Sequence, residues 1–164
     1  MEGLTLRAPA PLADRHLLDA FDSGAPALDD WLKRRARANQ AGGASRIYVV
    51  AEETGRVVAY YALASGALAS AVATGRLRRN MPDPIPMAII GRLAVDRGFQ
   101  GQGLGVAILR DAVLRTRQAA AILGIRGILV HALSEDAKRF YECHGFRAGS
   151  ASPMTLVMST ADRP

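Results

Sequence analysis

The sequence predicts one α/β (or α+β) domain that takes in all 164 residues. Strand-like runs of β-branched and aromatic residues alternate along the chain with segments of helical periodicity. The hydrophobic content of 49% is that of a globular protein, and no linker, repeat or low-complexity stretch divides the chain. A chain of this length buries a substantial core. We therefore expect a single domain spanning residues 1–164.

The first part of the chain predicts a short strand, a helix and a hairpin. Residues 4–9, LTLRAP, alternate like a strand that ends at prolines. Residues 25–43 begin with a proline and two aspartates, carry basic residues toward the end and close on two glycines, which together predict one helix. The runs 45–53 and 56–69 are rich in β-branched and aromatic residues and flank a Thr-Gly pair, so they predict a hairpin.

After a basic, proline-rich loop at residues 74–86, strands and helices alternate again. Residues 87–95, MAIIGRLAV, are almost wholly apolar and predict a strand buried on both faces. A glycine-rich stretch then leads into a helix that ends near Gly124. Its predicted buried side consists of Gly105, Leu109, Ala112, Thr116, Ala119 and Leu123. The last predicted elements are a strand at 127–133, a helix at 134–146 and a strand at 154–159.

Composition and charge exclude several classes of protein. The single cysteine, Cys143, rules out an internal disulfide and a cysteine-built metal site, and we expect no metal. The first residues lack the basic start and apolar core of a signal peptide, and no run approaches the roughly 18–20 apolar residues of a membrane span. We therefore expect a soluble, cytoplasmic protein with no membrane partner. The net charge of +6 favours a polyanionic partner such as nucleic acid.

Four glycines between Gly98 and Gly105 separate the strand at 87–95 from the helix that follows. This arrangement is typical of a phosphate site, because the first helical turn offers unpaired N–H groups and glycines remove the Cβ atoms. A P-loop needs Lys and then Ser or Thr after its last glycine, and a dinucleotide loop belongs to a first βα unit, so neither applies. We define residues 97–105 as the glycine loop and expect its part from Gln100 to Gly105 to hold a diphosphate. The alternative is a tight turn without a ligand.

The glycine loop resembles the acetyl-CoA loop of the Gcn5-related N-acetyltransferases (GNAT), whose pattern is Gln or Arg, two residues, Gly, one residue, and then Gly or Ala. Gln100, Gly103 and Gly105 match this pattern. The resemblance implies the GNAT fold, a mixed, mostly antiparallel sheet with a splayed pair of strands and helices on both faces. It also implies main-chain contacts to acetyl-CoA from the preceding strand. The expected cofactor-binding residues are Leu93, Ala94, Val95, Arg97, Gly98, Gln100, Gly101, Gln102, Gly103, Leu104, Gly105 and Tyr141.

The second part of the resemblance is FYECHGF, residues 140–146. Adjacent helical residues point about 100° apart, so we expect Phe140 in the core and Tyr141 turned toward the cofactor. A tyrosine is protonated at neutral pH and can donate to a departing thiolate, which makes Tyr141 the expected general acid. The alternative is an aromatic packing pair. The strand before the glycine loop holds no carboxylate, which leaves His131 or water as the base, and Ser134 stands where many relatives have an asparagine.

Over nearly its whole length, the sequence looks like the GNAT toxins of bacterial type II toxin–antitoxin systems. The distinctive segments are LDDWL, YYALASG and the Pro-Ile-Pro lead into GRLAVD. The resemblance implies acetylation of the α-amine of aminoacyl-tRNA, a homodimer and a ribbon-helix-helix antitoxin. A tRNA acceptor needs a cationic surface that contacts its phosphates. We expect Trp31 to lie in the core and not to serve as a surface on which bases stack. The expected tRNA-binding residues are Arg34, Arg35, Arg76, Arg78, Arg79 and Arg92. The alternatives are acetylation of a small amine or a protein N-terminus, and a non-enzymatic module that binds CoA or nucleic acid.

Overall fold

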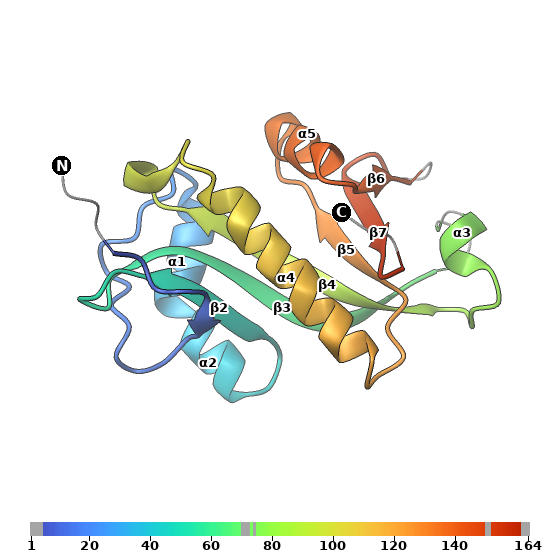
Figure 1. Cartoon of the computed structure of the whole chain (residues 1–164), viewed down its shortest axis with the longest axis horizontal. Helices are drawn as coiled ribbons and strands as arrows, with labels where there is room; N and C mark the ends of the chain where they lie inside the picture. The colour runs from blue at the N-terminus through green and yellow to red at the C-terminus, as the bar shows by residue number, and fades with distance from the viewer. Residues whose placement is uncertain (1–4, 70–72, 74, 150–151, 162–164) are drawn as a thin grey trace. The chain divides into compact units, whose positions relative to one another are not determined.

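The computed structural model describes residues 5–69, 73, 75–149 and 152–161. In this part of the chain a seven-stranded sheet has the order β1-β2-β3-β4-β5-β7-β6 (Figure 1). It is mixed and mostly antiparallel, with a parallel pair formed by β4 and β5, as predicted. The chain divides into two compact units, residues 1–63 with 92–112 and residues 64–91 with 113–164. Leu4 and Thr74, which begin the predicted first strand and basic loop, lie outside the described residues.

The helices and strands follow the predicted order. They are β1 (Ala10–Pro11), α1 (Pro26–Arg34), α2 (Ala36–Ala41), β2 (Arg46–Ala51), β3 (Val57–Leu68), α3 (Gly75–Arg78), β4 (Ile85–Val95), the 3-10 helix η2 (Arg97–Phe99), α4 (Leu104–Ala120), β5 (Gly127–His131), α5 (Glu135–Cys143), β6 (Arg147–Ala148) and β7 (Thr155–Ser159). Local sequence patterns did not predict α3, η2 or β6, nor a strand at Ala10–Pro11. None of the helices in the described part combines the length and apolar character needed to cross a bilayer.

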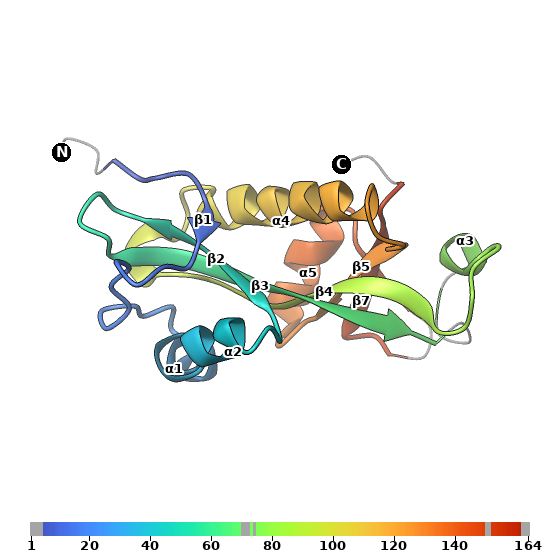
Figure 2. The same cartoon turned by 90° about the horizontal axis from the view of Figure 1, so that it is seen from below.

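In the first unit, α1 and α4 lie on opposite sides of β3 (Figure 2). Two adjacent tyrosines of this strand each fix one of these helices to the sheet. Side chains alternate along a strand, so Tyr60 and Tyr61 point to opposite faces. The Tyr60 hydroxyl donates to the carbonyl of Leu28 in α1 at 2.6 Å, and the Tyr61 hydroxyl donates to the carboxylate of Asp111 in α4. Both rings are fully buried. Helices therefore cover both faces of this part of the sheet, as expected.

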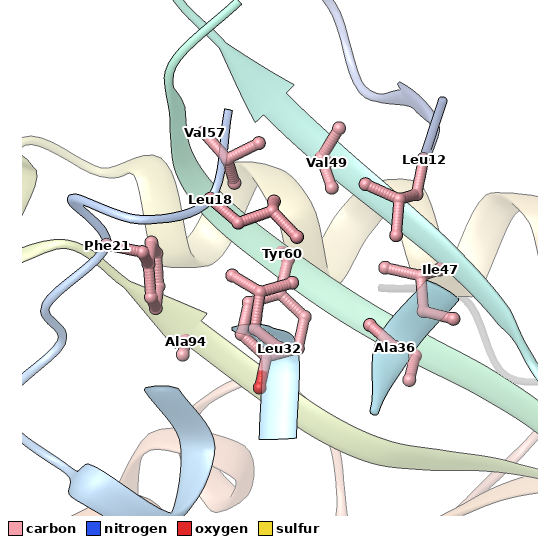
Figure 3. Close-up of a cluster of buried hydrophobic side chains, with 11 residues drawn as sticks. Leu12, Leu18, Phe21, Leu32, Ala36, Ile47, Val49, Val57, Tyr60 and Ala94 are labelled. Atoms are coloured by element: carbon pink, nitrogen blue, oxygen red, sulfur yellow. The ribbon is translucent and has the colours of Figure 1, made fainter. Parts of the chain in front are cut away.

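The core of the first unit lies between the α1–α2 segment and the strands beneath it (Figure 3). Leu32 and Ala36 lie four residues apart, so they share one side of the helical segment, and both are completely buried. They pack with Ile47 of β2 and with Tyr60 of β3. The ring of Phe21 meets Tyr60 edge to face at a centroid distance of 5.5 Å. This packing fixes the position of α1 on the sheet.

Three predicted boundaries are wrong. The predicted first helix is two helices, because Arg35 has φ −122° and ψ −27° and leaves helical geometry. The predicted first strand at residues 4–9 has only an isolated bridge at Leu6 in its described part, and the strand β1 lies after it at Ala10–Pro11. α4 ends one turn earlier than predicted, because the N–H groups of Ile122 and Leu123 both bond to the carbonyl of Ala119. Leu123 is consequently 63% exposed and not part of the buried side.

In the second unit, α3 and α5 cover opposite faces of the β5–β7 pair. Leu129 and Val157 are register partners and pack with Leu77 of α3 on one face. The neighbouring Met158 faces the end of α5, where a Cβ added at Gly145 would lie 3.1 Å from its methyl group. The basic segment predicted as a loop is therefore partly helical and is packed onto the sheet.

A buried histidine makes the stability of the first unit depend on pH. His16 is 3% exposed, and its Nδ1 accepts the N–H of Ala13 at 2.9 Å. Burial, and then the charge of Arg15, lowers the pKa of His16 from its usual 6.5, with a smaller lowering from Arg37. Because the unfolded chain then binds the proton more tightly than the folded chain, this stability is full above about pH 6.5 and is lost as the pH falls through the lowered pKa.

We therefore expect the melting temperature of the protein to fall between pH 7.5 and pH 5. His16→Asn keeps an acceptor near the Nδ1 position but cannot be protonated, so its melting temperature should change less over the same range. His131→Asn, at an exposed histidine, is the control and should follow the wild type. Scanning calorimetry measures all three proteins, and identical pH slopes for wild type and His16→Asn would contradict the assignment.

Candidate active site

The segment predicted to bind the cofactor begins on β4. The β4–β5 ladder runs from Met87 to Ile90 on β4, while β4 itself continues to Val95. Leu93 and Val95 are half-buried, and Ala94 between them lies in the core of the first unit. The predicted cofactor-contacting main chain therefore lies on the part of β4 beyond this ladder.

The glycine loop has a backbone suited to an anion. Gly101 and Gly103 have φ angles of +76° and +82°, a region that side chains with a Cβ rarely adopt. α4 begins at Leu104, and Ala107 donates to the Gly103 carbonyl at 3.0 Å, so the N–H groups before Ala107 have no acceptor within the helix. A Cβ added at either glycine would have nothing within 4 Å, so both Cα atoms face open space. These features fit the diphosphate of acetyl-CoA.

Substitution of Gly103 separates backbone strain from cofactor binding. Gly103→Ala should cost about 1–2 kcal/mol of strain and place a methyl group where the ligand approaches. Gly43 is a matched control, because its φ is +79° and an added Cβ there also meets nothing within 4 Å. We expect both variants to lose similar stability in thermal unfolding, whereas only Gly103→Ala raises the KM for acetyl-CoA. An equal rise in both variants would show that strain alone is responsible.

A buried carboxylate holds the start of the glycine loop. Asp96 is 4% exposed, and its Oδ1 accepts the N–H of Gly98 at 2.9 Å. Its Oδ2 accepts the N–H of Asp22 at 3.0 Å and Nη2 of Arg56 at 3.4 Å. Arg56 also pairs with Glu52 at 3.4 Å. Both carboxylate oxygens of Asp96 therefore accept hydrogen bonds, from two backbone N–H groups and from the guanidinium of Arg56. Because of these partners, the carboxylate is not available as a base.

Two residues of the expected cofactor-binding set, Gln100 and Arg97, also hold the glycine loop to the rest of the first unit. Nε2 of Gln100 donates to the carbonyls of Val95, at 2.8 Å, and Ser23, at 2.9 Å. Arg97 donates its N–H to the Asp22 carbonyl at 2.8 Å and pairs through Nε with Oδ1 of Asp22 at 3.1 Å. We call Asp22, Ser23, Arg56, Asp96 and Gln100 the loop anchor. The roles of Asp22 and Ser23 could not be predicted from the sequence. Their partners in and just before the glycine loop lie 74–77 residues further along the chain, and local periodicity carries no information about such distant contacts.

Tyr141 lies on α5, in the second unit, and is 8% exposed. Burial raises the pKa of its hydroxyl to about 12, so the group is protonated throughout the neutral range. Its ring packs against Phe140 and Phe146 at centroid distances of 5.3 and 5.5 Å. The predicted order of burial is wrong: Phe140 is only half-buried, because its ring also lies against His144 near the helix surface.

The remaining candidates near α5 have structural partners. His131 is exposed at the end of β5, with Nδ1 2.9 Å from Oγ1 of Thr155. Ser134 caps α5 by accepting the N–H of Ala137 at 3.1 Å. The residue that replaces the relatives' asparagine therefore has a capping role in this chain.

The predicted tRNA-binding arginines form one group in each unit. Arg34 and Arg35 are exposed at the end of α1, and the guanidinium of Arg92 lies 4.2 Å from the ring centroid of Trp31. Trp31, which was expected in the core, is only partly buried against it and stacks on Tyr60 at a centroid distance of 6.2 Å and an interplanar angle of 10°. In the second unit the exposed arginines lie on or next to α3, which Arg126 secures by donating to two of its carbonyls. They are Arg76, Arg78 and Arg79.

A strand that runs past its parallel partner into a glycine loop at a helix N-terminus is the arrangement that the resemblance to the GNAT acetyltransferases predicts for acetyl-CoA binding. Residues 44–148 match the family described as "Acetyltransferase (GNAT) domain", and the chain belongs to this family. It is an acetyl-CoA-dependent N-acetyltransferase.

Three relatives show which GNAT acetyltransferases this chain is similar to. The chain is 49% identical over 155 residues to a tRNA-acetylating toxin of Mycobacterium tuberculosis, covering 94% of this chain and 93% of that protein. The structure of AtaT complexed with acetyl-methionyl-tRNAfMet has a TM-score of 0.88 and 28% identity, with 95% of each chain covered. A tyrosine-to-phenylalanine variant of AtaT, bound to the C-terminus of the antitoxin AtaR and acetyl-CoA, has a TM-score of 0.80 and 28% identity, covering 95% of this chain and 94% of that chain.

Proposed function

We propose that this chain acetylates the α-amine of aminoacyl-tRNA and acts as the toxin of a type II toxin–antitoxin pair. The observation that carries the proposal is the 49% identity, over 94% of the chain, to a tRNA-acetylating toxin. The AtaT complexes with an acetylated aminoacyl-tRNA and with an antitoxin support the same assignment. The net charge of +6 suits an RNA substrate. Residues 1–164 act as one catalytic domain in this proposal.

The glycine loop and the end of β4 bind the cofactor. N–H groups from Gly101 to Gly105, including those of Gln102 and Leu104, bond the diphosphate in this proposal. Arg97, Gly98 and Gln100 lie at the start of the loop and complete the site. The main chain of Leu93, Ala94 and Val95 pairs with the pantetheine arm, and its N–H groups polarise the thioester carbonyl. Acetyl-CoA, when bound, supplies the acetyl group as a thioester. The loop anchor keeps these N–H groups in place.

In this proposal, the Tyr141 hydroxyl donates to the sulfur of the leaving thiolate. Transfer removes one proton from the attacking nitrogen and adds one to the sulfur. With a pKa of about 12, the Tyr141 hydroxyl is a permanent donor at neutral pH. Because an ordinary thiol has a pKa near 8.5, we propose that Tyr141 hydrogen-bonds the sulfur and passes a proton to it only as another proton arrives from the amine or water.

The acceptor needs little help from a base. The α-amine of an esterified amino acid is more acidic than a lysine side chain, so a neutral fraction is present at physiological pH. Arg34, Arg35 and Arg92 of the first unit, with the α3 arginines, contact the tRNA phosphates in this proposal. We further propose a cytoplasmic homodimer that a ribbon-helix-helix antitoxin neutralises.

The direct test is incubation of the purified protein with [acetyl-14C]acetyl-CoA and charged tRNA. We expect labelled N-acetyl-aminoacyl-tRNA, and no label on uncharged tRNA. Free polyamines and peptides with an open N-terminus are the competing substrates in parallel reactions. Labelling of those amines without labelling of charged tRNA would reject the toxin assignment while leaving the acetyltransferase family intact.

A further inference from the structure

A hollow of about 560 Å³ lies on the outer side of α1 and α2 in the first unit. Its volume falls within the range of small-molecule sites, roughly 300–1,000 Å³. Its lining residues come from α1, from Arg35 between the two helices, from α2 and from the turn after α2. The hollow is lined by Trp31, Arg35, Ala38, Asn39, Gly42 and Ala44.

The lining combines three kinds of surface. Trp31 supplies an aromatic edge, and Arg35 supplies an exposed cation. Ala38, Gly42 and Ala44 are exposed and small, which leaves room for a flat group. No carboxylate belongs to this lining. An aromatic surface, a cation and small walls together match a nucleobase with its phosphate.

The hollow is also connected to the proposed acetyl site through side-chain contacts. Trp31 lines the hollow, and its ring also contacts Arg92, whose guanidinium is 4.2 Å from the ring centroid. Arg92 directly precedes Leu93, where the proposed thioester-binding main chain begins. Arg92 points to the α1 side of β4, because the buried Ala94, two residues on, packs in the same core as Leu32. A single strand of RNA lying in the hollow would therefore pass Arg92 as it approaches Leu93.

We infer that this hollow binds one nucleotide of the unpaired 3′ end of tRNA, with its base against Trp31 and Ala38 and its phosphate at Arg35. The inference rests on the proposed function and adds a subsite to it. Sequence-tolerant stacking suits this end, which is single-stranded in every tRNA. The subsite orients the terminal aminoacyl group by holding the strand a short distance upstream.

Trp31 is the single tryptophan of the chain, so its fluorescence reports on the hollow directly. The first experiment titrates the protein with uncharged tRNA, with the same tRNA lacking its last three nucleotides, and with hexaglutamate. We expect the full-length tRNA to change the Trp31 emission and the other two probes to leave it unchanged. An equal change with trimmed tRNA overturns the inference, and a change with hexaglutamate alone assigns the hollow to an acidic protein partner.

The second experiment fills the hollow without touching the core. Ala38→Phe introduces a large side chain at an exposed position and adds no tryptophan emission. Ala121→Phe, at an exposed alanine just after α4, is the matched control. We expect Ala38→Phe to raise the KM for charged tRNA about tenfold, the size of one lost stacking contact. The KM for acetyl-CoA and the melting temperature should match those of the control.

The two experiments separate failure of the subsite from failure of the proposed function. If the wild type acetylates charged tRNA and Ala38→Phe has an unchanged KM, the subsite is wrong and the function stands. If charged tRNA is not acetylated but the emission change requires the 3′ nucleotides and is lost in Ala38→Phe, the nucleotide site stands without the toxin activity. Arg35→Ala should weaken full-length tRNA binding in the same titration, and unchanged binding would remove the proposed phosphate contact.

Discussion

Tyr141→Phe should lower kcat about a hundredfold or more while acetyl-CoA still binds. The substitution removes only the hydroxyl, and the ring contacts with Phe140 and Phe146 remain. The leaving sulfur would then depart without a hydrogen-bond donor at its side. Steady-state kinetics gives kcat, and isothermal titration calorimetry gives acetyl-CoA affinity. An unchanged kcat would remove Tyr141 from the mechanism.

The pH profile gives a second test of the same residue. Because burial raises the pKa of Tyr141 to about 12, ionisation of this group should not reduce activity up to about pH 10. Activity should instead rise with pH until the acceptor amine is neutral and then level off. Phe140→Leu, a change at the half-buried neighbour, is the control and should retain the wild-type profile. A fall in kcat between pH 8 and pH 10 would mean that the hydroxyl titrates within the working range.

Asp96→Ala should cause the largest loss of stability among single substitutions near the cofactor. It leaves the N–H groups of Asp22 and Gly98 and the charge of Arg56 without their common acceptor. Unsatisfied buried groups cost about 1–3 kcal/mol each, and Arg56 is partly exposed, so we expect a total of about 3 kcal/mol. At about 2–4 °C per kcal/mol for a protein of this size, the melting temperature should fall by about 6–12 °C.

The same variant should raise the KM for acetyl-CoA even at temperatures where it remains folded. The reason is that Asp96 fixes the turn from which the glycine loop begins. Asp96→Asn keeps the size and one acceptor oxygen, so it should recover part of both losses. Asp19→Ala, at an exposed aspartate, is the control and should leave both quantities unchanged. A normal KM in folded Asp96→Ala protein would show that the anchor stabilises the fold without shaping the cofactor site.

Local patterns in the sequence predicted the order of strands and helices well and their ends less well. The β2–β3 hairpin and the buried side of α4 at Leu109, Ala112 and Thr116 follow from periodicity, because burial imposes that spacing. The break at Arg35 does not follow from it, since basic residues on both sides favour a helix equally well. The packing of α3 also escaped prediction, because Arg126, from a distant segment, holds it in place.

For the candidate site too, local sequence patterns predicted some features and could not predict others. Glycine spacing predicted a loop whose backbone an anion can approach, and Gly101 and Gly103 have open space where a Cβ would lie. Their positive φ angles were not predicted. Sequence spacing could not tell that the side chain of Gln100 faces Ser23, because that contact depends on how two remote segments fold together. Burial likewise decided between the neighbours Phe140 and Tyr141, which the helical angle alone left undetermined.

The loop anchor has a consequence for truncated versions of this enzyme. Residues 44–148, the span that matches the family, include the glycine loop but neither Asp22 nor Ser23. A fragment cut to that span would keep every glycine of the glycine loop but lose two of the five residues of the loop anchor, Asp22 and Ser23. Protease cleavage between Ser23 and α1 would have the same result. We therefore expect acetyl-CoA binding to require the intact segment before α1.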